Sequence, residues 1–304
     1  MDGMDVAPPG PPPPPPPPVE DRCYRHTDVI TGVHCTRCGR AICTECMHPA
    51  PVGHQCPECV RGAKQEFHRA GRKVGSSASG VTLTKVLLGI LVAVYALEVV
   101  VAGPASLVGG PSTRALVRLG GSAGVLVAQG ETWRLFTAMF LHIGIFHLLM
   151  NGYALYIFGS VIEAEDGRVR FAAIFLVGGL FASAVSYAFG EPLVVSAGAS
   201  GAIFALFGAF LGTAWIHRDL AFYAARVRSA MTLVVLNLVI SFTVPGIDWR
   251  AHVGGLVGGL VLGIASARSR TRQGLFIAAC VGLLVLTAAL TMWRTDQITG
   301  MFVL

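Results

Sequence analysis

The chain contains few charged residues. Of its 304 residues only 13% are Asp, Glu, Lys or Arg, whereas 53% are hydrophobic, and the mean hydropathy is +0.63. A soluble globular domain carries about 25% charged residues. The low fraction of charged residues and the high fraction of hydrophobic residues exclude an ordinary soluble protein and indicate a chain that crosses a membrane several times. The formal net charge of +6 is modest, and we expect no nucleic acid as a partner.

The N-terminus lacks the features of a secretory signal. It reads MDGMDVAPPG and continues into a proline run, with neither a basic start nor an apolar stretch. We therefore expect the N-terminal part to stay in the cytoplasm, where clustered cysteines bind metal more often than they form disulfides. Residues 1–20 are predicted to form a Pro-rich disordered leader, and residues 63–82 a basic flexible linker.

Cysteine is almost absent outside one short segment. Seven of the eight cysteines lie between Cys23 and Cys59, in four pairs of potential ligands that each enclose two residues. The ligands are Cys23, His26, Cys35, Cys38, Cys43, Cys46, Cys56 and Cys59. A two-residue gap lets one tight turn present two ligands, and eight ligands are enough for two structural zinc ions. Because residues 21–62 have almost no apolar core, metal would supply the folding energy of this zinc-finger-like module.

The four ligand pairs allow more than one metal arrangement. An interleaved scheme places the first and third pairs on one zinc ion and the second and fourth pairs on the other. A single zinc ion with leftover thiols is the alternative. The spacing resembles that of the B-box-type zinc finger, whose cross-braced arrangement implies the interleaved scheme. A cytoplasmic protein is the candidate partner of this module, and pre-organisation of the linker is the alternative role.

Apolar runs of bilayer-spanning length begin at residue 83. Seven such runs, each near the roughly 20 residues that a helix needs to cross a bilayer, predict an all-α polytopic membrane protein. The predicted spans are 83–102, 137–161, 169–189, 200–216, 229–244, 251–267 and 274–293. Six of them form a core over 83–270, and 271–304 holds the seventh helix and a short tail. Lys and Arg concentrate in alternate connections, which predicts a cytoplasmic N-terminus and an outer C-terminus.

Polar side chains gather near the outer ends of three predicted spans. Ser200 begins the fourth span in VSAGASG and His252 begins the sixth in AHVGG, while His147 and Asn151 share one face of the second. Polar groups inside a bilayer are candidates for a functional site, although interhelical hydrogen bonding would also explain the pair on the second span. A serine nucleophile needs a base within hydrogen-bond reach, and a neutral histidine can provide it. Asp248 is expected in an outer loop, so the sequence favours a Ser-His dyad.

These motifs together resemble the rhomboid family of intramembrane serine proteases, over about residues 83–270. The matching residues are Trp133, Arg134, His142, His147, Asn151, Glu163, Gly198 to Gly201, Ala251, His252, Gly255 and Gly259. The resemblance implies a six-helix core in a bacterial cell membrane, to which the zinc module and the seventh helix are additions. It further implies an endopeptidase that cleaves transmembrane segments of protein substrates in the lipid bilayer, near the outer face.

The resemblance also implies roles for individual residues. Ser200 would be the nucleophile, His252 the general base, and His147 and Asn151 part of the oxyanion hole. The expected supporting residues are Trp133, Arg134, His142, Gly198, Phe204, Gly255 and Gly259, and Glu163 is expected to be structural. Phe204 stands where the family often has a tyrosine that stacks on the histidine. Two alternatives remain: a non-catalytic rhomboid-like protein that binds membrane clients, and a transporter or channel with a cytosolic zinc sensor.

Overall fold

The computed structural model describes residues 21–50, 52–61, 82–217, 221–268 and 273–302. The chain divides into two compact units, Met1–Ser77 and Ala78–Leu304, which we describe separately. The predicted leader at 1–20 and nearly all of the predicted linker at 63–82 lie outside the described residues.

The first unit has little regular structure. It contains the 3-10 helix η1 (Thr44–Cys46) and two short antiparallel strands, β1 (His48–Pro49) and β2 (His54–Gln55). Its buried core consists of Ile42 and five cysteines. A single buried aliphatic side chain contributes only about 1.5–3 kcal/mol, so other interactions must stabilise this unit.

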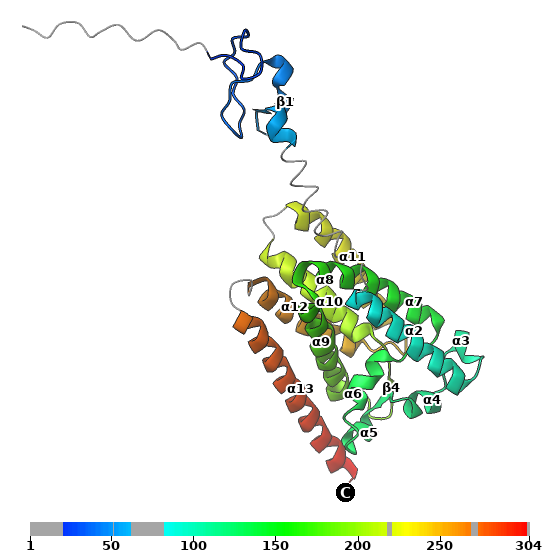
Figure 1. Ribbon diagram of the computed structural model, residues 1–304. Helices are drawn as coiled ribbons and strands as arrows, with labels where there is room; N and C mark the ends of the chain where they lie inside the picture. Colours follow the sequence, from blue (N-terminus) through cyan, green and yellow to red (C-terminus); the bar gives the residue numbers. More distant parts are fainter. Residues whose placement is uncertain (1–20, 51, 62–81, 218–220, 269–272, 303–304) are drawn as a thin grey trace, which may run out of the picture. The chain divides into compact units, whose positions relative to one another are not determined.

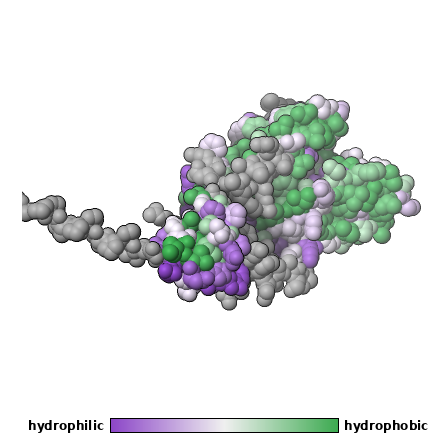
Figure 2. Space-filling model, turned by 90° about the horizontal axis from the view of Figure 1, so that it is seen from above, coloured by the Kyte–Doolittle hydropathy of each residue, from purple (hydrophilic) through white to green (hydrophobic). Residues whose placement is uncertain are grey.

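The second unit is built from helices (Figure 1). Its long helices are α2 (Leu83–Ala102), α9 (Arg168–Phe189), α10 (Ser200–Ile216), α11 (Ala221–Thr243), α12 (Trp249–Arg268) and α13 (Gln273–Phe302). One more helical segment joins α7 (Ile145–Ala154), the π-helical η3 (Leu155–Gly159) and α8 (Ser160–Asp166). Among the described residues, five helices are long and apolar enough to cross a membrane, and α10 and the apolar part of α11, Met231–Thr243, are shorter. Figure 2 shows broad apolar areas on the surface of this helical part, as expected of a multi-pass membrane protein.

The predicted start of the second span at residue 137 is wrong. Residues 134–140 form α6 (Arg134–Thr137) and the 3-10 turn η2 (Ala138–Phe140), and the spanning helix begins only at Ile145. Gly144, at φ +102°, precedes the first turn of α7, and the backbone N–H of His142 donates to the Glu98 carboxylate instead of to a helical carbonyl. The sequence did not predict this interruption, because the residues on both sides of it are mainly apolar. The structure also begins α11 at Ala221 and continues α13 to Phe302, beyond the predicted limits of 229 and 293.

The segment between α2 and α7 is folded rather than extended. It contains α3 (Ser106–Gly109), α4 (Thr113–Arg118), β3 (Ser122–Ala123) and α5 (Gly124–Ala128), followed by α6 and η2. Strand β3 pairs antiparallel with β4 (Val195–Ser196), immediately before α10. This small sheet connects the segment to the loop that leads to Ser200.

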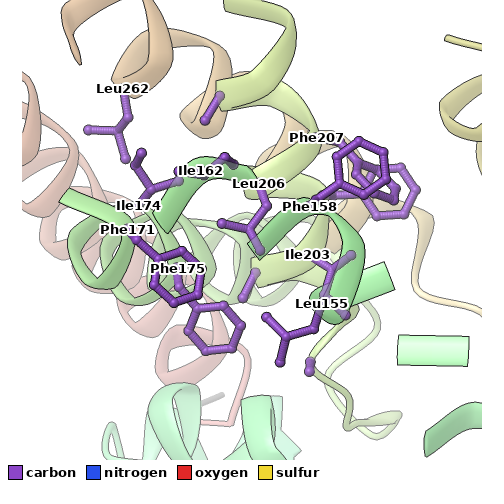
Figure 3. Close-up of a cluster of buried hydrophobic side chains, with 14 of the residues drawn as sticks. Leu155, Phe158, Ile162, Phe171, Ile174, Phe175, Ile203, Leu206, Phe207 and Leu262 are labelled. Carbon is purple, nitrogen blue, oxygen red and sulfur yellow. The ribbon is translucent and has the colours of Figure 1, made fainter. Parts of the chain in front are cut away.

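The core of the helical unit is a cluster of aromatic and aliphatic side chains. Figure 3 shows residues of η3, α8, α9, α10 and α12 in one group, in which the Phe158 and Phe207 rings meet edge to face with centroids 4.5 Å apart. Lipid chains are as apolar as these side chains, so close van der Waals packing and hydrogen bonds, rather than transfer out of water, hold such helices together.

Helices α10 and α12 approach each other backbone to backbone. A Cβ atom added at Gly255 would lie 2.1 Å from the carbonyl oxygen of Gly201, and one added at Gly259 would lie 1.9 Å from that of Ala205. A third contact repeats the pattern, with Gly263 against the Ala209 carbonyl. The glycines therefore permit the close crossing that their spacing predicts, and this crossing brings the N-terminal ends of α10 and α12 together.

Glu163 joins the end of α8 to the start of α2. Its carboxylate accepts hydrogen bonds from the backbone N–H groups of Leu83 and Thr84, each 2.8 Å long, and from the Thr84 hydroxyl at 2.7 Å. The first N–H groups of a helix have no partner within the helix, and a negative charge there is favourable. The contacts fit the structural role predicted for this residue.

Candidate functional site

The structure brings Ser200 and His252 into direct contact. The Ser200 Oγ lies 2.8 Å from the His252 Nε2, although 52 residues separate them in the chain. Ser200 is the first residue of α10, and His252 lies in the first turn of α12. His252 is buried and Ser200 is half-buried, so the hydroxyl is the more accessible member of the pair.

Local backbone geometry places both side chains. Gly198 has φ +143°, a conformation that side-chain-bearing residues rarely adopt, and its N–H donates to the Ala138 carbonyl at 2.9 Å. At the other helix, the Asp248 carboxylate accepts from the Ala251 N–H, as an N-terminal cap does. The same carboxylate accepts from the hydroxyl of Ser196, at the end of β4 and four residues before Ser200, at 2.7 Å. Asp248 thus connects the two segments that carry the pair.

One aromatic ring covers the histidine. The Phe204 ring stacks on the His252 imidazole with centroids 4.2 Å apart and an interplanar angle of 11°. Phe204 lies one helical turn after Ser200, so α10 supplies both the hydroxyl and the stacking surface. The ring therefore occupies the stacking position that the sequence suggested for Phe204.

His147 and Asn151 lie on α7 beside the serine. The space next to Gly198 is bounded by His147 and Ser200: a Cβ at Gly198 would lie 3.2 Å from the His147 Nε2 and 3.6 Å from the Ser200 Oγ. The Ile143 N–H donates to the His147 Nδ1, so the neutral imidazole carries its proton on Nε2. The Asn151 Nδ2 is buried without a hydrogen-bond partner in the described structure. His147 therefore lies close to Ser200, and Asn151 follows one turn later on the same face of α7.

His142 lies in the loop before α7 rather than within the second span as predicted. Its ring is fully buried and its centroid is 5.2 Å from that of His147. Its Nδ1 is 3.2 Å from the Phe140 carbonyl, which can only accept, so Nδ1 carries the proton. The bare Nε2 has no partner among the described residues, and His142 therefore packs against His147 without presenting a donor from that nitrogen.

Trp133 and Arg134 lie at the beginning of α6. Arg134 is buried and forms an ion pair with Glu131 at 2.7 Å. It also donates to the carbonyls of Val117 and Gly121, which holds the folded segment between α2 and α7 together. The Trp133 ring is half exposed and packs against the Arg134 guanidinium. Arg134 thus stabilises the folded segment that precedes α7.

Two polar residues of this region, Ser241 and Glu98, were not identified from the sequence. Ser241 on α11 contacts the His252 Nδ1 at 2.6 Å, and Glu98 on α2 binds the His142 backbone. Asp248 was expected only as a loop residue, and its links to Ser196 and Ala251 were not foreseen. Glu98 is a carboxylate inside an apolar run, a signal that could have marked it. A single serine in an apolar helix carries no such signal.

The first unit holds two clusters of potential metal ligands. Among the described residues, Cys23, His26, Cys43 and Cys46 form one group, and Cys35, Cys38, Cys56 and Cys59 form the other. Within each group the ligand atoms all lie within 4.8 Å of one another, and all the cysteines are free thiols. This grouping is the interleaved scheme. His34, His48 and His54 lie outside both groups.

The donor geometry of the clusters suits a tetrahedral ion. Sulfur atoms bound to one zinc ion at the usual 2.3 Å are about 3.8 Å apart, and the sulfur atoms of Cys38 and Cys56 are separated by 3.8 Å. Burial raises the pKa of the Cys35 thiol, but backbone hydrogen bonds from Cys56, Arg37 and Cys38 outweigh it and lower this pKa to about 6. The pKa of Cys23 is also lowered to about 6 by backbone hydrogen bonds that outweigh burial. A thiolate is the metal-binding form of cysteine, so each cluster has one ligand that ionises readily.

Comparison with known proteins identifies the family of the helical unit. Residues 129–269 match the Rhomboid domain. The putative rhomboid protease YdcA of Bacillus subtilis (strain 168) is 34% identical over 148 residues, which are 48% of this chain and 73% of that protein. The chain belongs to the rhomboid family.

Other rhomboid relatives are longer than the matched region. Rhomboid protease GluP of Bacillus subtilis (strain 168) is 39% identical over 184 residues, which cover 58% of this chain and 36% of GluP. RHOMBOID-like protein 6, mitochondrial, of Arabidopsis thaliana is 40% identical over 159 residues, which cover 51% of this chain and 50% of the relative. The chain thus spans between a third and a half of these two relatives. The segment with the two clusters of potential metal ligands lies outside the matched Rhomboid domain.

Proposed function

We propose that this rhomboid is an intramembrane serine endopeptidase that cleaves transmembrane segments of protein substrates within the lipid bilayer. The observation that carries the proposal is the 2.8 Å contact between the Ser200 Oγ and the His252 Nε2. A serine hydroxyl becomes an effective nucleophile when a base within hydrogen-bond reach accepts its proton. The name of GluP, rhomboid protease, and that of YdcA, putative rhomboid protease, support the same activity.

Acylation begins when the Ser200 Oγ attacks the scissile carbonyl carbon. The hydroxyl proton moves to the His252 Nε2 as the Oγ–C bond forms. The same nitrogen then gives this proton to the departing amine as the C–N bond breaks. In the second half of the reaction, His252 takes a proton from a water molecule as its oxygen attacks the acyl carbon. The imidazolium then returns this proton to the Ser200 Oγ as the Oγ–C bond breaks.

Two groups on α7 and one on α10 would stabilise the oxyanion. The proposed donors are the His147 Nε2–H, the Asn151 side-chain amide and the Ser200 backbone N–H at the beginning of α10. The Asn151 amide nitrogen has no partner within the described structure, so no existing hydrogen bond has to break before it donates to a negative oxygen. Loss of one such donor typically lowers the turnover rate by about 10²–10³-fold.

The reaction constrains the substrate. A transmembrane helix hides its peptide groups in internal hydrogen bonds and must unwind locally before a carbonyl can reach Ser200. We therefore propose substrates with small or helix-breaking residues near the outer end of the transmembrane segment. We also propose that the chain lies in a bacterial cell membrane with a cytoplasmic N-terminus and an outer C-terminus. The orientation is supported by the distribution of basic residues in the sequence, and the type of membrane by the family resemblance.

Cleavage in proteoliposomes tests this proposal. The purified chain is reconstituted with single-span reporter proteins whose outer half-span is rich in Gly and Ala, and fragments are analysed by mass spectrometry. We expect paired fragments that meet within the span in the presence of the wild-type chain, and none with Ser200→Ala. Equal cleavage by the two proteins, or no cleavage of any reporter, would contradict the proposal. In the second case, the non-catalytic client-binding function would gain support.

We also propose that the two cysteine clusters bind two structural zinc ions. Because the core of this unit is small, bound metal would stabilise its fold. Metal analysis of the purified full chain should find two zinc ions per molecule. Cys35→Ser and Cys46→Ser should each reduce the content to one, since they lie in different clusters.

Cys280→Ser is the matched control for the zinc measurement. Cys280 lies on α13 and belongs to neither cluster, so this variant should keep both ions. A wild-type chain that purifies without zinc would overturn the assignment, as would a single ion that both cluster variants remove.

We propose residues 21–62 as the limits of the zinc module, a cytoplasmic protein as its partner, and residues 83–270 as the protease core.

A further inference from the structure

The second ring nitrogen of His252 has a partner that the sequence did not reveal. The His252 Nδ1 lies 2.6 Å from the Ser241 Oγ, and the two residues come from different helices, α12 and α11. Both side chains are buried, with exposed fractions of 7% for His252 and 3% for Ser241. In a buried site, a polar contact of this length is a hydrogen bond whose loss is costly.

The direction of this hydrogen bond follows from the position of the serine proton. The Ser241 Oγ also lies 2.5 Å from the backbone carbonyl oxygen of Asn237, one turn earlier on α11. Two oxygen atoms at this distance repel unless a proton lies between them, and a carbonyl oxygen has none. The Ser241 hydroxyl therefore donates to Asn237 and has only lone pairs to offer to the histidine.

This direction determines the tautomer of His252. If Ser241 can only accept, the His252 Nδ1 carries the proton and donates it to the Ser241 Oγ. A neutral imidazole has one N–H, so the Nε2 is left with a lone pair, which faces the Ser200 Oγ at 2.8 Å. The hydrogen bonds then run one way, from Ser200 to His252 to Ser241 to the Asn237 carbonyl. This is the arrangement in which His252 can accept the serine proton.

In the described part of the chain, no carboxylate accepts a hydrogen bond from the His252 Nδ1. Asp248, four residues before His252, binds the hydroxyls of Ser186 and Ser196 and the Ala251 N–H, and it makes no hydrogen bond to the imidazole ring. Phe204 contacts only the face of the ring. The Nδ1 thus has Ser241 as its one hydrogen-bond partner among the residues that the structure describes.

We propose that Ser241 is a positioning residue, which holds His252 in the tautomer and orientation needed for general-base catalysis. The inference rests on the proposed protease function and extends its dyad to a Ser200–His252–Ser241 chain. When the Nε2 takes the Ser200 proton, the Nδ1–H remains bonded to Ser241 and the ring keeps its place. A neutral hydroxyl stabilises the resulting imidazolium less than a carboxylate would.

A matched pair of substitutions at Ser241 tests this role. Ser241→Thr keeps the hydroxyl and adds a methyl group, whereas Ser241→Val has nearly the same shape as threonine but no hydroxyl. The measured quantity is covalent labelling of the chain by a fluorophosphonate probe, separated into the maximal rate kinact and the half-saturating concentration KI. We expect Ser241→Val to lower kinact by about tenfold or more relative to Ser241→Thr, with an unchanged KI. Equal kinact values for the two variants would show that the hydroxyl has no positioning role.

A second measurement keeps this inference separate from the protease function. Nitrogen-15 NMR of histidine-labelled protein, with His252→Ala used to identify the His252 signals, distinguishes a protonated from a bare ring nitrogen. We expect a protonated Nδ1 and a bare Nε2 in the wild-type chain, and a mixture of tautomers in Ser241→Val. The opposite tautomer in the wild type would overturn the inference. If the probe labels no variant, the protease function fails, and the NMR result still decides the role of Ser241.

Discussion

Replacing His252 with alanine should lower cleavage of a transmembrane reporter by at least about 10³-fold. The Ser200 hydroxyl is a weak nucleophile on its own, and its only basic hydrogen-bond partner in the described structure is the His252 Nε2, 2.8 Å away. Loss of a member of a serine–histidine pair removes the activated nucleophile, and such losses reach about 10⁴–10⁶-fold in soluble serine proteases. The measurement is the initial cleavage rate in proteoliposomes at equal amounts of folded protein.

His217→Ala is the matched control for this variant. His217 follows the last turn of α10, at the opposite end of the helix that begins with Ser200. A helix of this length separates its ends by about 25 Å, so this histidine should not affect the chemistry. Retention of more than about a tenth of the wild-type rate by His252→Ala would show that another group is the base.

Replacing Gly259 with alanine should unfold or severely destabilise the helical unit. The added Cβ would lie 1.9 Å from the Ala205 carbonyl oxygen, well inside contact distance, and the obstacle is backbone, which cannot rotate away. Helices α10 and α12 would have to separate along the crossing that brings Ser200 to His252. Overpacking of a tight site typically costs 1–3 kcal/mol, and we expect about 3 kcal/mol here. The free energy of unfolding in mixed micelles and the cleavage rate measure the two effects.

Gly282→Ala makes the same chemical change on α13. A Cβ at Gly282 meets no atom within 4 Å, and alanine is the better helix former, so stability should be unchanged or slightly higher. Similar losses at both glycines would indicate sensitivity to any helical substitution and would contradict the proposed role of the α10–α12 contact.

The sequence predicted the main helices because hydrophobicity alone defines them. Six of the predicted spans coincide with helices, although the ends of α11 and α13 differ by eight or nine residues. The predicted start of the second span was wrong, because Leu141 and His142 are as compatible with a helix as with the loop that they form. The decisive groups there are Glu98, which binds the His142 N–H, and Gly144, whose positive φ precedes α7. Such long-range contacts leave no periodic pattern in the sequence.

The sequence predicted those parts of the candidate site in which a polar residue interrupts an apolar run or follows a recognisable motif. His147 and His252 are polar residues inside apolar runs, and polar groups are costly there. Ser200 stands out because it follows a small-residue loop at the start of a span, together with the family resemblance. Their proximity depends on glycines whose packing function follows from their spacing. Ser241 was not predictable, because serine is common in membrane helices and its partner lies on another helix. The hydrogen-bond links of Asp248 to Ser186 and Ser196 depend equally on tertiary structure.

Active-site labelling is the most direct test of the central claim that Ser200 is an activated nucleophile. The reconstituted wild-type chain is treated with a fluorophosphonate probe and digested, and the modified residue is identified by mass spectrometry. We expect a single adduct on Ser200, which is absent in Ser200→Ala and formed much more slowly in His252→Ala. Equal labelling of the wild type and Ser200→Ala, or an adduct on another serine, would contradict it.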